Sequence, residues 1–235
     1  MSEPFPVVSV VVPVLDEAEG IGRALAGLQA LRGAGGEVIV VDGGSRDATR
    51  AIASPLADLV IDAPRGRALQ MNAGAGAARG PLLVFLHADT VPPAGALEGL
   101  GARLEASGRC WGRFDVTIDG TDPMLALVAH LMNARSRWTG IATGDQAIFA
   151  RRDAFERAGG FPEIPVMEDV ALSKILKRVS PPLCLRDRVV TSGRRWQRRG
   201  TLRTILLMWR LRLAYALGAD PRLLARRYDV ERTSS

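Results

Sequence analysis

Residues 1–90 alternate between short apolar runs of strand length and segments with a helical pattern. The apolar runs fall at residues 7–13, 37–42, 59–62 and 81–86. The helical segments between them fall at residues 20–32, 46–53 and 67–78. Such alternation is typical of β-α-β units, whose crossovers make neighbouring strands parallel. The sequence therefore predicts an α/β fold with a mostly parallel central sheet and flanking helices.

The second half of the chain has a more mixed pattern. Residues 114–119 alternate with period two and predict a half-exposed strand. Further strands are predicted at residues 146–150 and 183–191, and helices at residues 123–138, 167–178 and 200–217. The last helix carries an apolar face of Leu202, Ile205, Leu206, Trp209, Leu213 and Leu217. Trp138 and His130 are predicted to pack in the interior.

Composition limits the compartment and the class of protein. Two cysteines without metal-ligand spacing favour a reducing compartment. We find no basic segment followed by an apolar signal core, and no uncharged run of about 18 residues, the length needed to span a membrane. We therefore expect a cytoplasmic protein, at the inner face of the membrane if its tail binds lipid.

The charge of the chain is concentrated at its end. From Arg188 onward, twelve arginines stand against three acidic residues, a net charge of +9 in a chain of net charge +6. A basic tail suggests an anionic partner, and we expect membrane lipid or phosphate rather than nucleic acid. The alternative is a solvated helix face, or a face that packs on the domain or on a second subunit in a homodimer.

Acidic clusters follow the predicted strands. They are Asp16-Glu17 after the first strand, Asp42 after the second and His87-Ala88-Asp89 after the fourth, and a later pair, Glu168-Asp169, begins a helix. Strand ends of an open α/β sheet converge on one crevice, where ligands bind. Acids also favour helix N-termini, which alone accounts for Glu17 and Glu168. For Asp42 we favour ligand contact, and for the nearby Ser45 and Asp47 helix capping.

In order and spacing, these segments resemble the family-2 glycosyltransferases of the GT-A fold. The matching segments are 10–17 (VVVPVLDE), 40–49 (VVDGGSRDAT), 85–89 (FLHAD) and 168–169 (ED). A bacterial subgroup of transferases shares the segments 66–72 (GRALQMN), 144–146 (GDQ) and 194–196 (RRW). The resemblance implies a nucleotide-diphospho-sugar transferase domain, residues 1–195, with a nucleotide-binding half to about residue 90 and an acceptor half after it. Residues 196–235 are expected to form a basic amphipathic helical tail.

The resemblance also implies roles for individual residues. The enzyme would transfer a sugar with inversion from a nucleotide-diphosphate donor, UDP-linked by preference, to an acceptor hydroxyl. Asp169 would be the general base, and Asp89 would hold Mg²⁺ or Mn²⁺ against the diphosphate. The nucleotide-binding set is Pro13, Val14, Glu17, Asp42, Arg67, Gln70, Asn72, Ala88 and Asp89. The acceptor or supporting set is Glu168, Gly144, Asp145, Gln146, Arg195 and Trp196.

One position departs from the family pattern. His87 stands where the first aspartate of the metal motif is expected, and we favour a hydrogen-bonding role for it over metal ligation. The acceptor is not identified by the sequence, and a lipid-linked one would suit the basic tail. A scaffold that binds nucleotide without turnover, docked on a membrane or not, is the alternative. A dehydrogenase is excluded because no Gly-x-Gly-x-x-Gly loop follows the first strand.

Overall fold

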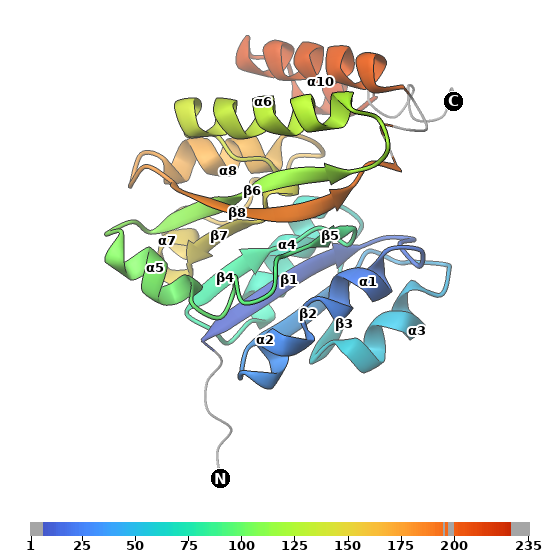
Figure 1. Cartoon of the computed structure of the whole chain (residues 1–235), viewed down its shortest axis with the longest axis vertical. Coiled ribbons are helices and arrows are strands. Elements are labelled where there is room, and N and C mark those ends of the chain that lie inside the picture. Colours follow the sequence, from blue (N-terminus) through green and yellow to red (C-terminus); the bar gives the residue numbers. More distant parts are fainter. Residues whose placement is uncertain (1–6, 195, 197–199, 227–235) are drawn as a thin grey trace.

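A computed structural model describes residues 7–194, 196 and 200–226. It contains one eight-stranded sheet with the order β3-β2-β1-β4-β7-β6-β8-β5 (Figure 1). The strands are β1 (Val8–Val14), β2 (Glu37–Asp42), β3 (Leu59–Asp62), β4 (Leu82–Phe85), β5 (Thr90–Val91), β6 (Trp111–Asp119), β7 (Ile148–Arg151) and β8 (Leu183–Ser192). All run in one direction except β5 and β7. The predicted α/β class and mostly parallel sheet are confirmed.

Helices cover both faces of this sheet. They are α1 (Ile21–Ala26), α2 (Gln29–Gly33), α3 (Thr49–Ala53), α4 (Arg67–Ala77), α5 (Leu100–Ala106), α6 (Met124–Thr139), α7 (Arg152–Arg157), α8 (Glu168–Leu176) and α10 (Thr201–Ala216), with 3₁₀ turns η1 (Ser54–Leu56) and η2 (Gly144–Gln146). In β1, Val10 and Val12 belong to one apolar core with α1, α5 and α6, and Val11 to another with α4, α7 and α8. Both faces of β1 are therefore buried, which explains its continuous apolar run.

Strand β6 differs from its prediction as a half-exposed strand. It is longer than expected, and nearly all of it is buried. Two polar positions of this strand are buried as an ion pair, because Arg113 is fully buried against Asp115, and only Asp119 at its end is exposed. Arg137 of α6 contacts the same aspartate, and Arg113 also donates a hydrogen bond to the Asn133 carbonyl. Part of the alternation of polar and apolar residues in this strand therefore comes from a buried ion pair beneath α6 and not from exposure to solvent.

Other boundaries also differ. The helix predicted at residues 20–32 is two helices, α1 and α2, because the chain turns at Gly27 and Leu28. A Cβ on Gly27 would lie 2.9 Å from the Val91 side chain, so only glycine allows this close approach to β5. The short elements α5, α7 and β5 were not predicted. The interior packing predicted for Trp138 and His130 is wrong: both are exposed, Trp138 by 91%.

The tail helix α10 lies beside α6 (Figure 1). Its buried side is centred on Leu211, which packs with Met167 and Val170 at the start of α8. The apolar face predicted for it is divided, since Ile205 is partly buried whereas Leu206, Trp209, Leu213 and Leu217 are exposed. The Leu202 side chain is outside the described part. Across the described residues, we find no helix with the length and apolar character needed to cross a membrane.

The packing of α4 on the sheet gives a matched pair of glycine substitutions. A Cβ on Gly74 would collide with Val11 of β1 and lie 2.8 Å from Val41 of β2, whereas a Cβ on Gly76 would meet nothing within 4 Å. We expect Gly74→Ala to lower the free energy of unfolding by about 1–3 kcal/mol through overpacking. Gly76→Ala should raise it by about 0.5–1 kcal/mol through helix propensity. Urea unfolding measures both; equal stabilities would contradict this packing.

Candidate functional site

The loops after β1 and β2 are joined by side chains of the second loop. The Asp16 amide donates to Ser45 Oγ at 3.0 Å, and the Ala18 amide to Asp47 Oδ2 at 3.1 Å. The Glu17 amide donates to Thr49 Oγ1 at 2.7 Å. Ser45 and Asp47 therefore hold the two loops together. The N-cap position of α3 is Ala48, and Asp47 Oδ1 also accepts a 2.9 Å hydrogen bond from the Thr49 amide at the start of that helix. This pairing fixes the backbone that carries Glu17.

Asp42 is buried at the end of β2 and is engaged in its own turn. Its Oδ1 accepts hydrogen bonds from the Ser45 amide at 2.9 Å and the Ser45 hydroxyl at 2.7 Å. Its Oδ2 lies 3.8 Å from Arg50 Nη1. These contacts give Asp42 a structural role, and contact with a nucleoside stays a prediction.

Two amides of the 66–72 segment also hold the scaffold. Gln70 Nε2 donates to the carbonyls of Val14 at 2.8 Å and Val41 at 2.9 Å, which ties together the ends of β1 and β2. Asn72 exchanges two 2.8 Å hydrogen bonds with the backbone of Phe161. Both hydrogens of the Gln70 side-chain amide are donated to backbone carbonyls. This side chain therefore holds the ends of β1 and β2 together and has no hydrogen left to donate to a ligand.

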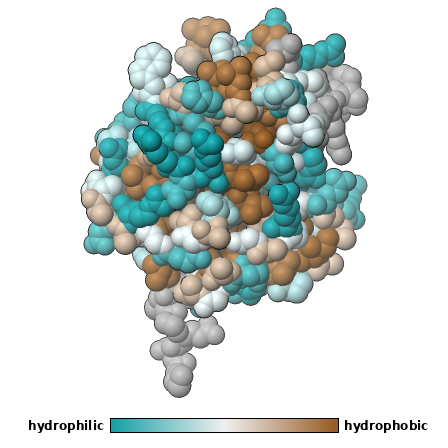
Figure 2. Space-filling view, viewed as in Figure 1, coloured by the Kyte–Doolittle hydropathy of each residue, from teal (hydrophilic) through white to brown (hydrophobic). Residues whose placement is uncertain are grey.

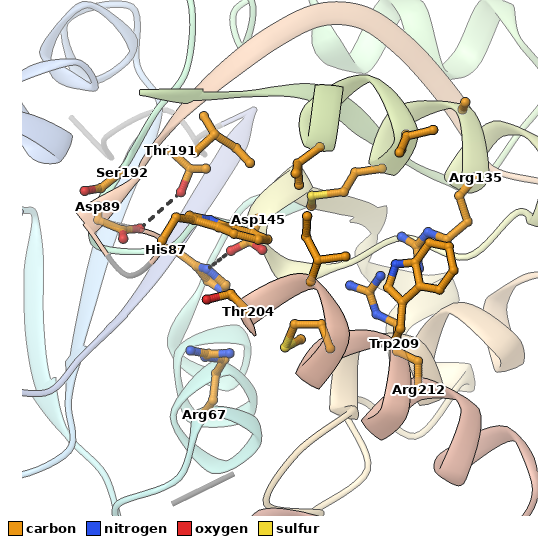
Figure 3. Close-up of a pocket in the computed structure, with 18 of the residues that line it drawn as sticks. Arg67, His87, Asp89, Arg135, Asp145, Thr191, Ser192, Thr204, Trp209 and Arg212 are labelled. Carbon is orange, nitrogen blue, oxygen red and sulfur yellow. Dashed lines mark hydrogen bonds and ion pairs between the residues drawn. The ribbon is translucent and has the colours of Figure 1, made fainter. Parts of the chain in front are cut away.

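A pocket of about 550 Å³ opens at the carboxyl ends of β1 and β4 (Figure 3). On one side it is lined by members of the predicted set: Pro13, Glu17, Arg67, Ala88, Asp89, Asp145 and Trp196. On the other side it is lined by residues of α6 and α10. The predicted residues outside the lining are Val14, Asp42, Gln70, Asn72, Gly144, Gln146, Glu168 and Asp169. Arg195 is outside the described residues.

Asp169 sits in the first turn of α8, beside η2. Its Oδ2 accepts a 2.8 Å hydrogen bond from the Gly144 amide, and its Oδ1 accepts one of 2.7 Å from the Val170 amide. The Met167 backbone before it is left-handed, with φ of 68°. Gln146 in turn closes η2 by bonding back to Thr143. Gly144 and Gln146 therefore fix the Asp169 carboxylate.

His87 links the end of β4 to the same turn. Its Nδ1 lies 3.2 Å from Asp145 Oδ1. A Cβ on Gly144 would collide with the imidazole, so glycine is needed there for His87 to fit. Its Nε2 is buried and finds no hydrogen-bond partner among the residues described. His87 thereby connects the predicted donor side to the turn that orients Asp169.

Two carboxylates, Glu17 and Asp89, lie near each other on the pocket wall. Burial raises the pKa of Glu17, and the negative charge of Asp89 raises it further, while Arg194 lowers it from 3.8 Å away. Asp89 Oδ1 accepts weak hydrogen bonds from Thr90 Oγ1 at 3.3 Å and Thr191 Oγ1 at 3.4 Å. Such a pair attracts a cation.

A metal ion at Asp89 would have few protein ligands. Within the described ranges, no three His, Cys, Asp or Glu side chains gather closely enough to hold an ion by themselves. Mg²⁺ in phosphate-transfer sites takes one or two carboxylates and completes its shell with water and substrate phosphates. Asp89, with Glu17 beside it, fits that kind of site, in which a bound diphosphate supplies further ligands.

The pocket contains two arginines that sequence reasoning missed. Arg135 comes from α6 and Arg212 from α10, and both line the pocket. Burial lowers the pKa of Arg135 to about 10, and the positive charge of Arg212 contributes. No motif marks either residue. Their proximity depends on how α10 docks, which the helical periodicity of the tail leaves open.

A family model describes most of the chain. Residues 9–159 match the model of the glycosyl transferase family 2. The glycosyltransferase AglE of Haloferax volcanii is 35% identical over 101 residues, which cover 39% of this chain. The match spans 33% of that protein, so the similarity covers about a third of the length of this relative.

Solved structures share the fold. TarS of S. aureus, in a complex with UDP, superposes with a TM-score of 0.62 at 18% identity, over 79% of this chain and 60% of that one. The mannosyltransferase PcManGT of Pyrobaculum calidifontis, in a complex with GDP-Man and Mn²⁺, gives a TM-score of 0.63 at 24% identity, over 90% and 61%. The GT-A type of fold expected from the sequence is confirmed.

The burial of Glu168 predicts a pH-dependent stability. Burial raises the pKa of Glu168 above its usual 4.5, and Asp169 raises it further, although Arg67 Nη1 lies 3.6 Å away. A carboxyl with a raised folded-state pKa penalises the fold once it ionises, so stability falls as pH rises above about 4.5 through the folded pKa. Glu168→Gln should remove this fall and be more stabilising at pH 7.5 than at pH 4 in urea unfolding.

The exposed Glu163 on the preceding loop provides a control for this prediction. Glu163→Gln should change the free energy of unfolding by less than about 0.5 kcal/mol at either pH. A Glu168→Gln variant whose stability relative to the unmodified chain is the same at pH 4 and pH 7.5 would show that Glu168 does not carry this penalty.

Proposed function

The chain belongs to glycosyl transferase family 2, and we propose that it transfers a sugar with inversion from a UDP-sugar to an acceptor hydroxyl. The observation that carries this proposal is the pocket at the carboxyl ends of the strands, where Glu17, Asp89 and Arg67 share one wall. Ligands of open α/β sheets bind at that edge. Beyond this wall, the pocket continues between α6 and α10, where an acceptor can enter.

The donor nucleotide is proposed to lie against Pro13 and Glu17 at the end of β1. UDP is proposed as its nucleotide because TarS, which shares the fold, was solved with UDP. PcManGT was solved with GDP-Man, so the fold accepts more than one base. Arg67, at the N-terminus of α4 and beside Glu168, is proposed to face the diphosphate because guanidinium binds phosphate oxygens in pairs.

A Mg²⁺ or Mn²⁺ ion is proposed as cofactor, with Asp89 as its protein ligand. When bound, the ion neutralises charge on the departing diphosphate. The support for this role is the carboxylate pair of Asp89 and Glu17, and the Mn²⁺ in the PcManGT complex. His87 is proposed to position the η2 turn through Asp145 and not to ligate the metal.

Asp169 is proposed as the general base. The Gly144 and Val170 amides hold both of its oxygens, so the carboxylate has a fixed orientation beside the pocket. It would accept the proton of the acceptor hydroxyl while that oxygen attacks the anomeric carbon opposite the leaving nucleotide. A base positioned in this way contributes about 10²- to 10⁴-fold to the rate.

The tail is proposed to contact an anionic membrane at the cytoplasmic face. Exposed apolar side chains gather on α6 and α10: Leu127, Leu131, Trp138, Leu206, Trp209, Leu213 and Leu217. Figure 2 shows apolar side chains at the end of the molecule formed by these helices. Arg203 and Arg210 are exposed on α10 among them. A lipid-linked acceptor suits this surface; a second copy of the chain is the alternative occupant.

A turnover assay tests the transferase proposal. UDP-sugars with Mn²⁺ should release UDP, and removal of the metal with EDTA should suppress the release. Asp169→Asn should bind UDP within about twofold of the unmodified chain and lower the rate of UDP release by about 10²- to 10⁴-fold, because only the base is lost. Glu163→Gln serves as the control for removing a carboxylate.

Two outcomes would oppose the proposal. Normal turnover in Asp169→Asn would remove this residue from the mechanism. Tight UDP binding without metal dependence, and without release of UDP from any donor, would favour the non-catalytic scaffold.

Vesicle binding tests the membrane contact. The chain should co-sediment with vesicles that contain phosphatidylserine at low salt, and less so at high salt, since each basic residue near the surface is worth about 1 kcal/mol. Leu213→Asp should abolish most of this binding, whereas Val179→Asp, at an exposed apolar residue beyond α8, should not. No sedimentation of the unmodified chain at low salt would contradict the contact.

A further inference from the structure

The pocket extends well beyond the wall assigned to the donor. Figure 3 shows Arg67, His87 and Asp89 at one end and Arg135, Trp209 and Arg212 at the other. The far end lies between α6 and α10 and is largely apolar, with Val128, Met132, Ile205 and Met208 in its lining. Two guanidinium groups therefore stand in mainly apolar surroundings.

Neither guanidinium is fully satisfied by the chain. Nε and Nη2 of Arg135 and Nε of Arg212 are buried without a hydrogen-bond partner among the residues that the structure places. Buried polar atoms are normally hydrogen-bonded, and leaving a charged one unpaired costs about 1–3 kcal/mol or more. Arg113, buried beneath the same helix, also leaves its Nε without a partner, but its terminal nitrogens are bonded to Asp115 and to the Asn133 carbonyl.

The two arginines also repel each other. The charge of Arg212 disfavours the charged form of Arg135, as does that of Arg113, whereas the negative charges of Asp169 and Asp145 favour it. Neither aspartate forms an ion pair with Arg135 or Arg212 among the described contacts; Asp169 is bound to the Gly144 amide and Asp145 to His87. Two like charges that have no carboxylate hydrogen-bonded to them among the described contacts form a site for an anion.

We propose that Arg135 and Arg212 bind a phosphate that the acceptor carries in addition to its reacting hydroxyl, and that the apolar body of this acceptor lies along α6 and α10. A phosphate monoester carries a charge between about −1.5 and −2 at neutral pH, which matches two guanidinium groups better than a single carboxylate does. Guanidinium also pairs with phosphate in a two-pronged geometry.

The apolar surroundings define the rest of this acceptor. Trp138 and Trp209 both line the pocket and are largely exposed, by 91% and 66%, so they stand where the pocket meets solvent. An apolar chain attached to the phosphate can leave the pocket past these rings. The proposal rests on the proposed function, because it assigns this end of the pocket to the acceptor rather than to the donor.

Binding of n-octyl phosphate to the full chain, followed by calorimetry and by tryptophan fluorescence, tests this site. Octyl phosphate should bind at least tenfold more tightly than inorganic phosphate, which lacks the apolar chain, and than octanoate, which carries one charge. Arg135→Gln and Arg212→Gln should each weaken it by about ten- to a hundredfold, the loss of a charged hydrogen-bonded pair. Their affinity for UDP should stay within twofold.

The control is Arg178→Gln, which removes the same charge from an exposed position just after α8 and should leave octyl phosphate binding unchanged. Circular dichroism checks the fold of each variant. If Arg135→Gln does not fold, Arg135→Lys is the substitute. It keeps the positive charge but loses the planar guanidinium, so its affinity for octyl phosphate should fall between those of the unmodified chain and of Arg212→Gln.

The opposing outcomes are distinct. Octyl phosphate that binds both glutamine variants as tightly as the unmodified chain overturns the site. Inorganic phosphate that binds as tightly as octyl phosphate overturns the apolar part. Loss of UDP affinity in both variants, with octyl phosphate unaffected, would move the arginines to the donor. Octyl phosphate binding without any UDP binding would keep the site and overturn the proposed transferase instead.

Discussion

Burial of both faces of the sheet is the constraint on which the rest of this molecule depends. Val10, Val11 and Val12 of β1 are all fully buried, because helices cover the sheet on either side. Polar side chains on such strands need a paired partner or a place at the strand ends. Arg113 and Asp115 are the first case, and Glu17 and Asp89 the second. The polar side chains that could bind a ligand therefore lie together at the carboxyl ends of the strands.

The residues at these strand ends can be predicted from the sequence, because the local apolar pattern shows where each strand stops. The apolar runs that end in Asp42 and His87 mark strand ends, and parallel strands bring such ends together. Much of the 66–72 segment proved to be scaffold, since Gln70 and Asn72 bond to backbone. A conspicuous motif residue can thus act by holding strands in place, and sequence alone does not separate this role from ligand contact.

The rest of the site depends on packing between distant segments. The apolar face of residues 200–217 was recognised, but an amphipathic helix can bury several overlapping faces, and the neighbour decides which. Here Leu211 is buried against α8, which places Arg212 in the pocket lining and Trp209 at the exposed border of the same pocket. Trp138 was expected in a core for its size, yet it lies on the open side of α6. The helical periodicity of the sequence does not determine which face of α6 or α10 is buried.

The docking of α10 also explains why the two ends of the pocket differ in chemistry. One end is built from strand ends and carries charged groups of both signs, the carboxylates of Glu17 and Asp89 and the guanidinium of Arg67. The other is built between two helices, and its charged groups, Arg135 and Arg212, have the same sign. His87, Asp145 and Gly144 stand between them and connect the donor wall to Asp169. In the reaction proposed above, the first end would bind the donor, the second would bind the acceptor, and Asp169, held by the Gly144 amide, would be the base.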